Sequence, residues 1–176
     1  MDGPAVTAAP PSWRAMRPDD LAAVCVLADR VHPGLREDPA IFAERLALYP
    51  AGCFVLERRQ IIAGYAIAHP IRYPDPPSLN MRIGSLPPDC DALYIHDVAL
   101  SPEARGEGQA GAVIGHLLQL AAGFPRACLV SVYGTAAFWQ RFGFSDAAAV
   151  LPSGALSAYG EDARFMQRLT PDCAAT

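Results

Sequence analysis

Residues 94–111 have the sequence YIHDVALSPEARGEGQAG, in which an apolar strand leads through a glycine-rich turn into the start of an apolar helix. Glycines let the main chain approach a phosphate closely, and the first turn of a helix offers unpaired N–H groups with about half a positive charge. Arg105 begins the turn and adds a cation whose fork of donors matches a phosphate. The segment therefore predicts an anion site, in particular one for a pyrophosphate.

Two known classes of phosphate-binding protein have this order of strand, glycine turn and helix. The residue spacing distinguishes this chain from both. Gly106, Gly108 and Gly111 match the GxGxxG pattern of dinucleotide-binding proteins. That class needs an acidic residue about 20 positions later to hold the ribose, and none occurs between Glu107 and Asp146. A nucleotide triphosphate loop needs a lysine directly after its last glycine, and no lysine follows these glycines. The spacing disfavours the first class and excludes the second.

Hydrophobic periodicity on both sides of this segment predicts further helices and strands. Two helices come first, and β-prone runs on either side of residues 58–60 predict a hairpin. Residues 70–89 contain six prolines, too many for regular structure, so we expect a substrate-side loop there. The expected strands are 12–17, 53–57, 61–68, 92–100, 127–133 and 164–169, and the expected helices are 18–31, 38–49, 108–122 and 136–141.

The bulk composition is that of one soluble domain. A chain of 176 residues buries about two thirds of the surface that its unfolded form exposes. No apolar run approaches the about 20 residues that span a bilayer. The net charge of −4 and the scattered cations give no electrostatic footprint for nucleic acid. We therefore expect neither a nucleic-acid partner nor a membrane span.

The termini and the cysteines indicate location and boundaries. The N-terminus lacks the basic start and continuous apolar run of a secretory signal. Five cysteines, an odd and widely spaced set without a Cys-x-x-Cys pair, predict reduced thiols and no metal site. We therefore expect a cytoplasmic protein with one domain over residues 12–170, a flexible N-terminal tail over 1–11 and a C-terminal tail over 171–176.

Two motifs resemble those of the GNAT superfamily. Residues 105–110 (RGEGQA) follow a strand that ends in VALSP, which is similar to the coenzyme A motif of that superfamily. Residues 137–144 (AFWQRFGF) are similar to its short helix with an aromatic pair and a closing Gly-Phe. The resemblance covers about residues 12–169. It implies an α/β (α+β) fold with a single GNAT-like domain, in which a mixed, mostly antiparallel central sheet of six to seven strands is flanked by about four helices.

The resemblance also implies an activity, that of an acetyl-CoA-dependent N-acetyltransferase, with acetyl-CoA as co-substrate. Main-chain N–H groups of the turn would hold the pyrophosphate, the end of the strand would lie beside the pantetheine arm, and Trp139 would line the coenzyme cleft. The carboxylate of Glu107 must point away from phosphate, into solvent. The residues that the resemblance places at the coenzyme are Val98, Ala99, Leu100, Arg105, Gly106, Glu107, Gly108, Gln109, Ala110 and Trp139.

Catalysis requires deprotonation of the attacking amine. An alkyl ammonium with a pKa near 10.4 is about three units above neutrality, a cost of about 4 kcal/mol, so a general base should help. Asp97 and His96 are the candidates; as strand neighbours they should point to opposite faces, so at most one would face a given cleft. Members of the superfamily commonly use a tyrosine to protonate the thiolate, whereas Trp139 occupies the matching position. Either Tyr133 or water supplies the proton, or no acid is needed, because a thiol is already a fair leaving group.

The acceptor is the least determined part of the function. The resemblance implies a primary amine of a small molecule or of a protein, which attacks the thioester directly in a ternary complex, and we expect a monomer or a homodimer. His69, Tyr73 and Asp75 in the proline-rich segment are candidate contacts, whereas His32 and His116 have no supporting constellation and are expected to lie on an amphipathic helix or at the surface. The alternative hypothesis is a non-catalytic acyl-CoA-binding module, motivated by the tryptophan at position 139.

Overall fold

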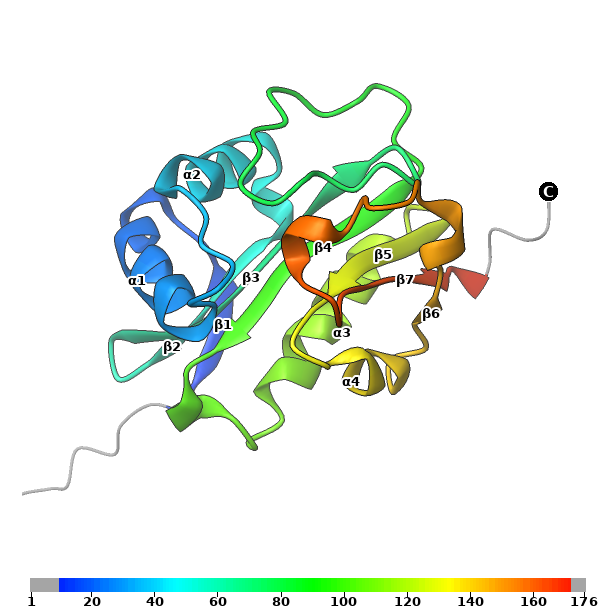
Figure 1. Cartoon of the computed structure of the whole chain (residues 1–176). Coiled ribbons are helices and arrows are strands. Elements are labelled where there is room, and N and C mark those ends of the chain that lie inside the picture. Colours follow the sequence, from blue (N-terminus) through cyan, green and yellow to red (C-terminus); the bar gives the residue numbers. More distant parts are fainter. Residues whose placement is uncertain (1–9, 172–176) are drawn as a thin grey trace, which may run out of the picture.

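A computed structural model describes residues 10–171 and contains one seven-stranded sheet with the strand order β1-β2-β3-β4-β5-β7-β6 (Figure 1). Neighbouring strands are antiparallel except for β4 and β5, which are parallel. The mixed, mostly antiparallel sheet predicted from the sequence is thus confirmed. The strands are β1 (Ser12–Ala15), β2 (Cys53–Arg58), β3 (Ile61–Ile71), β4 (Ala92–Leu100), β5 (Arg126–Ser131), β6 (Ser145–Asp146) and β7 (Arg164–Leu169).

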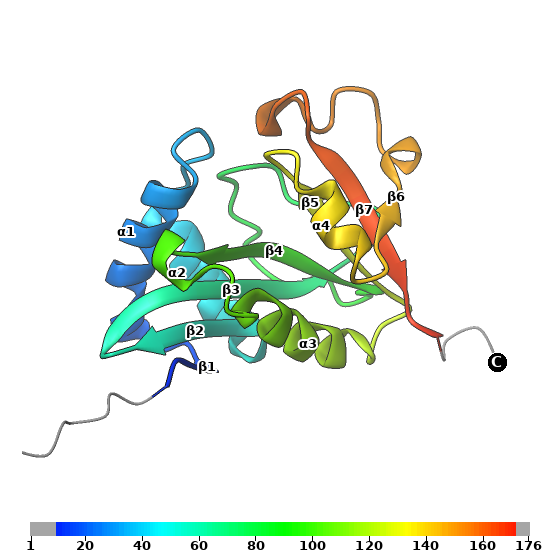
Figure 2. The ribbon, with the colours of Figure 1, turned by 90° about the horizontal axis from the view of Figure 1, so that it is seen from below.

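Four helices cover the two faces of the sheet (Figure 2). Helices α1 (Leu21–Val31) and α2 (Pro39–Leu48) pack on one face, and α3 (Gln109–Ala121) and α4 (Ala136–Gln140) pack on the other. Strand β3 contributes to both interfaces because successive side chains alternate between faces. Tyr65 and Ile67 lie in the core under α1 and α2, and Ala66 and Ala68 lie in the core under α3. In the part of the chain that the structure describes, no helix is both long enough and apolar enough to cross a bilayer.

Helix α2 begins where the sequence predicts it. Asp38 caps α2 by accepting a hydrogen bond from the N–H of Ala40 at 2.8 Å, and Pro39 occupies the first turn, where its missing N–H costs nothing. The chain between α1 and α2, residues 32–38, lies against β4, where His32 contacts Asp97 and Glu37 contacts His96.

Several boundaries differ from the expectation by two or three residues: β1 and β5 end earlier, α1 begins later and β3 ends later. Strand β3 continues through Pro70 to Ile71, which pair with Leu93 and Ala92. Pairing of β3 with β2 ends at Ile67, so a proline at position 70 has a free edge on that side, where no donor is needed. The short β6 was not predicted, because two residues carry no periodic pattern. The predicted tails lie almost entirely outside the described residues.

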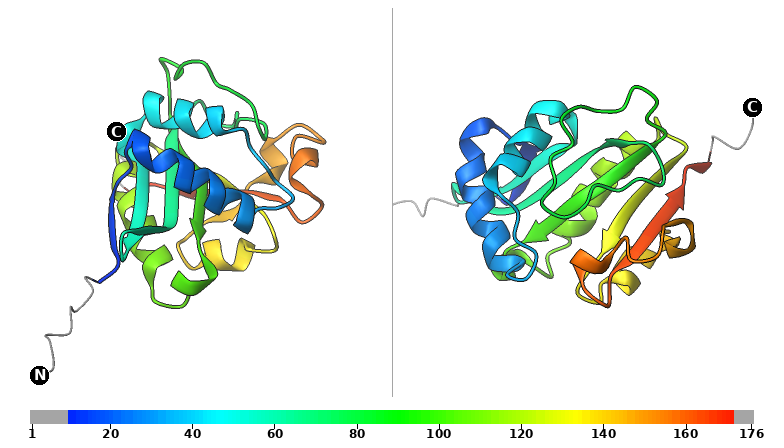
Figure 3. Two further views of the ribbon diagram at one scale, coloured as in Figure 1. Left: turned by 90° about the vertical axis from the view of Figure 1, so that its left-hand side faces the viewer. Right: turned by 45° about the horizontal axis from the view of Figure 1, so that its top comes forward.

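Two irregularities in β4 create the site. The register between β3 and β4 shifts, so that Ile67 pairs with Asp97 and Ala68 with Ile95, and His96 is left without a partner. Pairing between β4 and β5 ends at Ile95 and Leu129, and the strands then diverge (Figure 3). A bulge re-aims a side chain, and an unpaired strand edge exposes main-chain donors and acceptors to a ligand.

Candidate active site

A groove of about 870 Å³ runs from the end of β4 over the glycine turn and the N-terminus of α3. Gly106 and Gly108 have positive φ angles of 81° and 76°, a conformation that an L-residue adopts only with strain. In the described part of the chain, the N–H groups of residues 106–111 donate to no main-chain acceptor, and the first helical bond is that of Ala112 to Gly108. The groove therefore presents a row of unpaired donors at the positive end of a helix.

Charged side chains around the groove agree with an anionic ligand. Arg105 and Arg141 line it, and its described lining contains no Asp or Glu. The Glu107 carboxylate faces the opposite way, where it pairs with Arg58 at 3.2 Å. One expected donor is already occupied: the N–H of Arg105 lies 3.3 Å from the oxygen of Pro102. The main-chain cradle available to a ligand thus begins at Gly106 and not at Arg105.

A second cavity, of about 170 Å³, lies across β4 from the groove. It includes side chains of β4, the segment between α1 and α2, the end of β5, helix α4, and Leu79 of the proline-rich segment. Because β4 and β5 diverge beyond Ile95, the groove and the cavity meet. The residues that line both are His32, Val98, Tyr133, Thr135 and Phe138.

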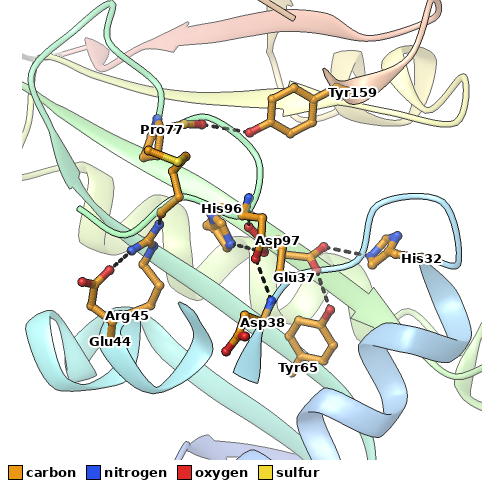
Figure 4. A network of polar contacts seen from close by, with 12 residues as sticks. His32, Glu37, Asp38, Glu44, Arg45, Tyr65, Pro77, His96, Asp97 and Tyr159 are labelled. Atoms are coloured by element: carbon orange, nitrogen blue, oxygen red, sulfur yellow. Dashed lines mark hydrogen bonds and ion pairs between the residues drawn. The ribbon is translucent and has the colours of Figure 1, made fainter. Parts of the chain in front are cut away.

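Asp97 is held in this cavity by two hydrogen bonds. His32 Nε2 lies 3.1 Å from one carboxylate oxygen, and the Tyr65 hydroxyl donates to the other at 2.5 Å (Figure 4). Burial raises the pKa of Asp97, but the charge and hydrogen bond of His32 and the hydrogen bond from Tyr65 outweigh it, so the pKa is lowered. Burial conversely lowers the pKa of His32, and Asp97 raises it by more. Each partner therefore favours the charged form of the other, an imidazolium beside a carboxylate.

His96 belongs to a second carboxylate–histidine pair. Its Nε2 lies 2.8 Å from Glu37 Oε2, and both side chains are less than a tenth exposed. Burial raises the pKa of Glu37, but the hydrogen bonds of His96 and of the Asn80 N–H lower it by more, so the pKa is lowered and Glu37 is a carboxylate. A carboxylate can only accept, so Nε2 carries the proton and Nδ1 of a neutral ring keeps its lone pair. Nδ1 has no partner among the described residues.

Tyr133 lies at the junction of groove and cavity. Its ring stacks on His32 with centroids 5.7 Å apart, and about half of its surface is exposed. Tyr133 and Gly134 have φ angles of 54° and 68°, so the chain makes a left-handed turn there, between β5 and α4. Burial raises the pKa of the Tyr133 hydroxyl, which therefore keeps its proton at neutral pH.

Three expectations about these side chains need correction. His96 and Asp97 both line the cavity, because the register shift beside His96 breaks the alternation of a regular strand. Trp139 is buried in the core and lines the cavity, whereas Phe138 lines the groove as well. His32, expected to have no functional partner, is only 19% exposed and contacts Asp97 at 3.1 Å.

The candidate acceptor contacts in the proline-rich segment also lie elsewhere. His69 is on β3 and fully buried, and burial and the neighbouring His96 lower its pKa to about 3, so it is neutral. Tyr73 packs against Phe165 and beneath Arg126, outside the described lining of the cavity. Asp75 does not contribute to that lining either.

Glu37 is the functional candidate that the sequence did not indicate. It is one of many acidic residues between predicted helices, and its partner is 59 positions away. No local pattern marks such a residue, because its environment arises only when the segment between α1 and α2 is placed against β4.

The model of the acetyltransferase (GNAT) family matches residues 21–144. No curated protein matches the sequence. Among solved structures, the loading GNATL domain of CurA from Lyngbya majuscula is 15% identical, with a TM-score of 0.71 over 92% of this chain and 98% of that chain. Naa50 from Arabidopsis thaliana, in complex with the bisubstrate analogue CoA-Ac-MVNAL, is 14% identical, with a TM-score of 0.64 over 90% of this chain and 97% of that chain.

A third solved structure, the GphF GNAT-like decarboxylase in complex with isobutyryl-CoA, is 21% identical, with a TM-score of 0.68 over 90% of this chain and 99% of that chain. At such identities these likenesses show the fold alone. The fold predicted from the two sequence motifs is confirmed by them and by the family match.

Proposed function

The chain belongs to the acetyltransferase (GNAT) family, and we propose that it transfers the acetyl group of acetyl-CoA to a primary amine in a ternary complex. The observation that carries this proposal is the junction at which a groove of unpaired main-chain donors meets a cavity with two carboxylate–histidine pairs. A thioester at the junction would have the coenzyme on one side and the acceptor on the other. The free cysteines of the described part support the cytoplasm as the proposed location.

The coenzyme would lie along the groove with its pyrophosphate over the N–H groups of residues 106–111. Arg105 and Arg141 would add charge attraction. The pantetheine arm would follow the edge of β4 beyond Ile95, which β5 leaves unpaired. An acetyl group is favoured over longer acyl groups because the cavity of about 170 Å³ must hold both the acyl group and the reactive end of the acceptor.

In the proposed reaction the amine nitrogen forms a bond to the thioester carbonyl carbon. The oxyanion formed in this step would accept hydrogen bonds from main-chain N–H groups near Val98, and one such donor is typically worth about 3 kcal/mol in the transition state. The C–S bond then breaks and leaves an amide and a thiolate. One proton leaves the nitrogen and one is returned to the sulfur.

Two residues are proposed for these proton transfers. His96 takes the proton from the amine, because its Nδ1 is free while Glu37 fixes Nε2. Asp97 is less suited to this role, since both of its oxygens are engaged and its pKa is lowered. It positions His32 instead. Tyr133, at the junction, is proposed to protonate the departing thiolate.

The experiment combines coenzyme binding by calorimetry with release of free thiol from acetyl-CoA in the presence of a panel of amines. Arg105→Ala and Gly108→Glu should each weaken coenzyme binding, by about tenfold or more for the glycine, because a carboxylate would face the phosphates and a non-glycine residue is strained at that φ. Gly115→Ala, within α3 and outside the groove, is the matched control.

Unchanged affinity in both variants would overturn the assignment of the groove. Tight binding of acetyl-CoA without thiol release for any amine would instead support the non-catalytic acyl-CoA-binding module.

A further inference from the structure

We infer that the acceptor is a small organic ammonium ion with an apolar body and no carboxylate, and neither an amino acid nor a protein chain. This inference rests on the proposed function, because it concerns the acceptor side of the same junction. Three features of the cavity carry it: the sign of its charges, the chemistry of its walls, and the loops that cover it.

The charges in the cavity favour a cation. Glu37 and Asp97 line it, and no arginine is among its described lining residues. Each carboxylate forms a hydrogen-bonded pair with a histidine, so the histidines do not provide an unpaired positive charge for an anionic acceptor. The nearby cation Arg45 is fully buried and directed elsewhere, to Glu44 and to the main-chain oxygen of Met81. An acceptor carboxylate would therefore find no unpaired counterion in a cavity that already holds two carboxylates.

The walls of the cavity are mainly aromatic and aliphatic. Tyr94, Phe138, Trp139 and Tyr159 contribute rings, and Leu35 and Leu79 are among the aliphatic side chains. Aromatic faces attract an ammonium group through the ring quadrupole and pack against an apolar body. Such walls offer few hydrogen-bonding groups to the main chain of a peptide.

Three segments from distant parts of the sequence cover the cavity and are tied to one another. The Tyr159 hydroxyl, between β6 and β7, donates to the main-chain oxygen of Pro77 at 2.8 Å (Figure 4). Asn80 joins the proline-rich segment to the segment between α1 and α2: its N–H donates to Glu37 at 3.0 Å, and its side-chain oxygen accepts from the N–H of Asp38 at 2.7 Å.

This cover restricts the size of the acceptor. A cavity of about 170 Å³ corresponds to about five or six water volumes, which is the space of a small amine. An extended peptide would have to pass between the tied segments and break the hydrogen bonds of Tyr159 and Asn80. A free amine needs only the volume inside them.

The test measures thiol release from acetyl-CoA with matched acceptors. Isobutylamine is compared with valine and 3-methylbutylamine with leucine, so that each pair differs by one carboxylate and each amine is small enough for the cavity, and a peptide with a free N-terminus and a lysine side chain provides the macromolecular arm. We expect kcat/KM to be about 100-fold or more higher for the amine of each pair, and no turnover of the peptide. Equal or better use of the amino acids or of the peptide would overturn the inference and leave the proposed function standing. If none of the acceptors causes thiol release, the proposed function itself fails.

A variant separates charge from shape. Leu79→Arg places a cation at the wall of the cavity and should reduce the preference for the amine over the amino acid by about tenfold. Leu79→Met has nearly the same volume and no charge, and it should keep the substrate ratio of the parent. If Leu79→Arg leaves that ratio unchanged, the electrostatic part of the inference is wrong.

Discussion

Replacing His96 with Gln tests the proposed base directly. His96 is 7% exposed, and its Nε2 lies 2.8 Å from Glu37. A glutamine retains an N–H donor for that carboxylate but has no group that titrates near neutrality. The substitution therefore removes the proton acceptor while preserving most of the volume and one hydrogen bond.

The expected loss follows from the ionisation of the acceptor. An alkyl ammonium with a pKa near 10.4 is more than three units above neutral pH, which corresponds to about 4 kcal/mol at 1.36 kcal/mol per unit. A positioned base typically contributes about 10²- to 10⁴-fold. We therefore expect His96→Gln to lower kcat/KM by about 10²- to 10³-fold near pH 7.

The pH profile distinguishes a base from a merely structural residue. The deficit of His96→Gln should shrink toward unity near pH 10, where the free amine is abundant, and it should be smaller for a less basic amine at pH 7. Thiol release across pH with two amines of different basicity measures both effects. His116→Gln, an exposed histidine on α3, is the control. A deficit that is the same at every pH and for both amines would refute the role of His96 as base.

Two further predictions concern stability. Burial lowers the pKa of His32, but the neighbouring Asp97 carboxylate raises it by more, so the pKa is raised. The charged ring therefore stabilises the fold fully below the ordinary pKa of histidine, and this stabilisation is lost as pH rises through the raised pKa. We expect His32→Gln to lower the melting temperature more at about pH 5.5 than at about pH 9. Gly52→Ala should destabilise by about 2 kcal/mol or more in urea unfolding, because its Cβ would lie 2.1 Å from the main-chain oxygen of Ala68, whereas Gly115→Ala, with no atom within 4 Å, should stabilise α3 by about 0.5–1 kcal/mol. An equal loss from His32→Gln at both pH values, or an equal effect of the two alanines, would contradict these assignments.

Local sequence preferences were sufficient to predict most of the strands and helices and the glycine turn. The strand over Ala92–Leu100 and the turn of Gly106 and Gly108 follow from short-range rules, since apolar periodicity, glycine torsion and helix capping depend on neighbours in the chain. The same rules predicted the bounds of most other strands and helices to within a few residues. They missed the extension of β3 and the two-residue β6, where pairing partners and not sequence pattern determine the structure.

The cavity depends on contacts between distant residues. His32 pairs with Asp97 across 65 positions and Glu37 pairs with His96 across 59 positions. These pairs form because the register shift directs two adjacent residues of β4 into one cavity and because β5 leaves β4 beyond Ile95. The sequence by itself therefore determined most strands and helices and the glycine turn of the proposed coenzyme site, which depend on local preferences, while the arrangement of the sheet was implied by the resemblance to the GNAT superfamily. Only the tertiary structure decided which side chains surround the acceptor, because their burial, charge and partners exist only once the loops are packed against the sheet.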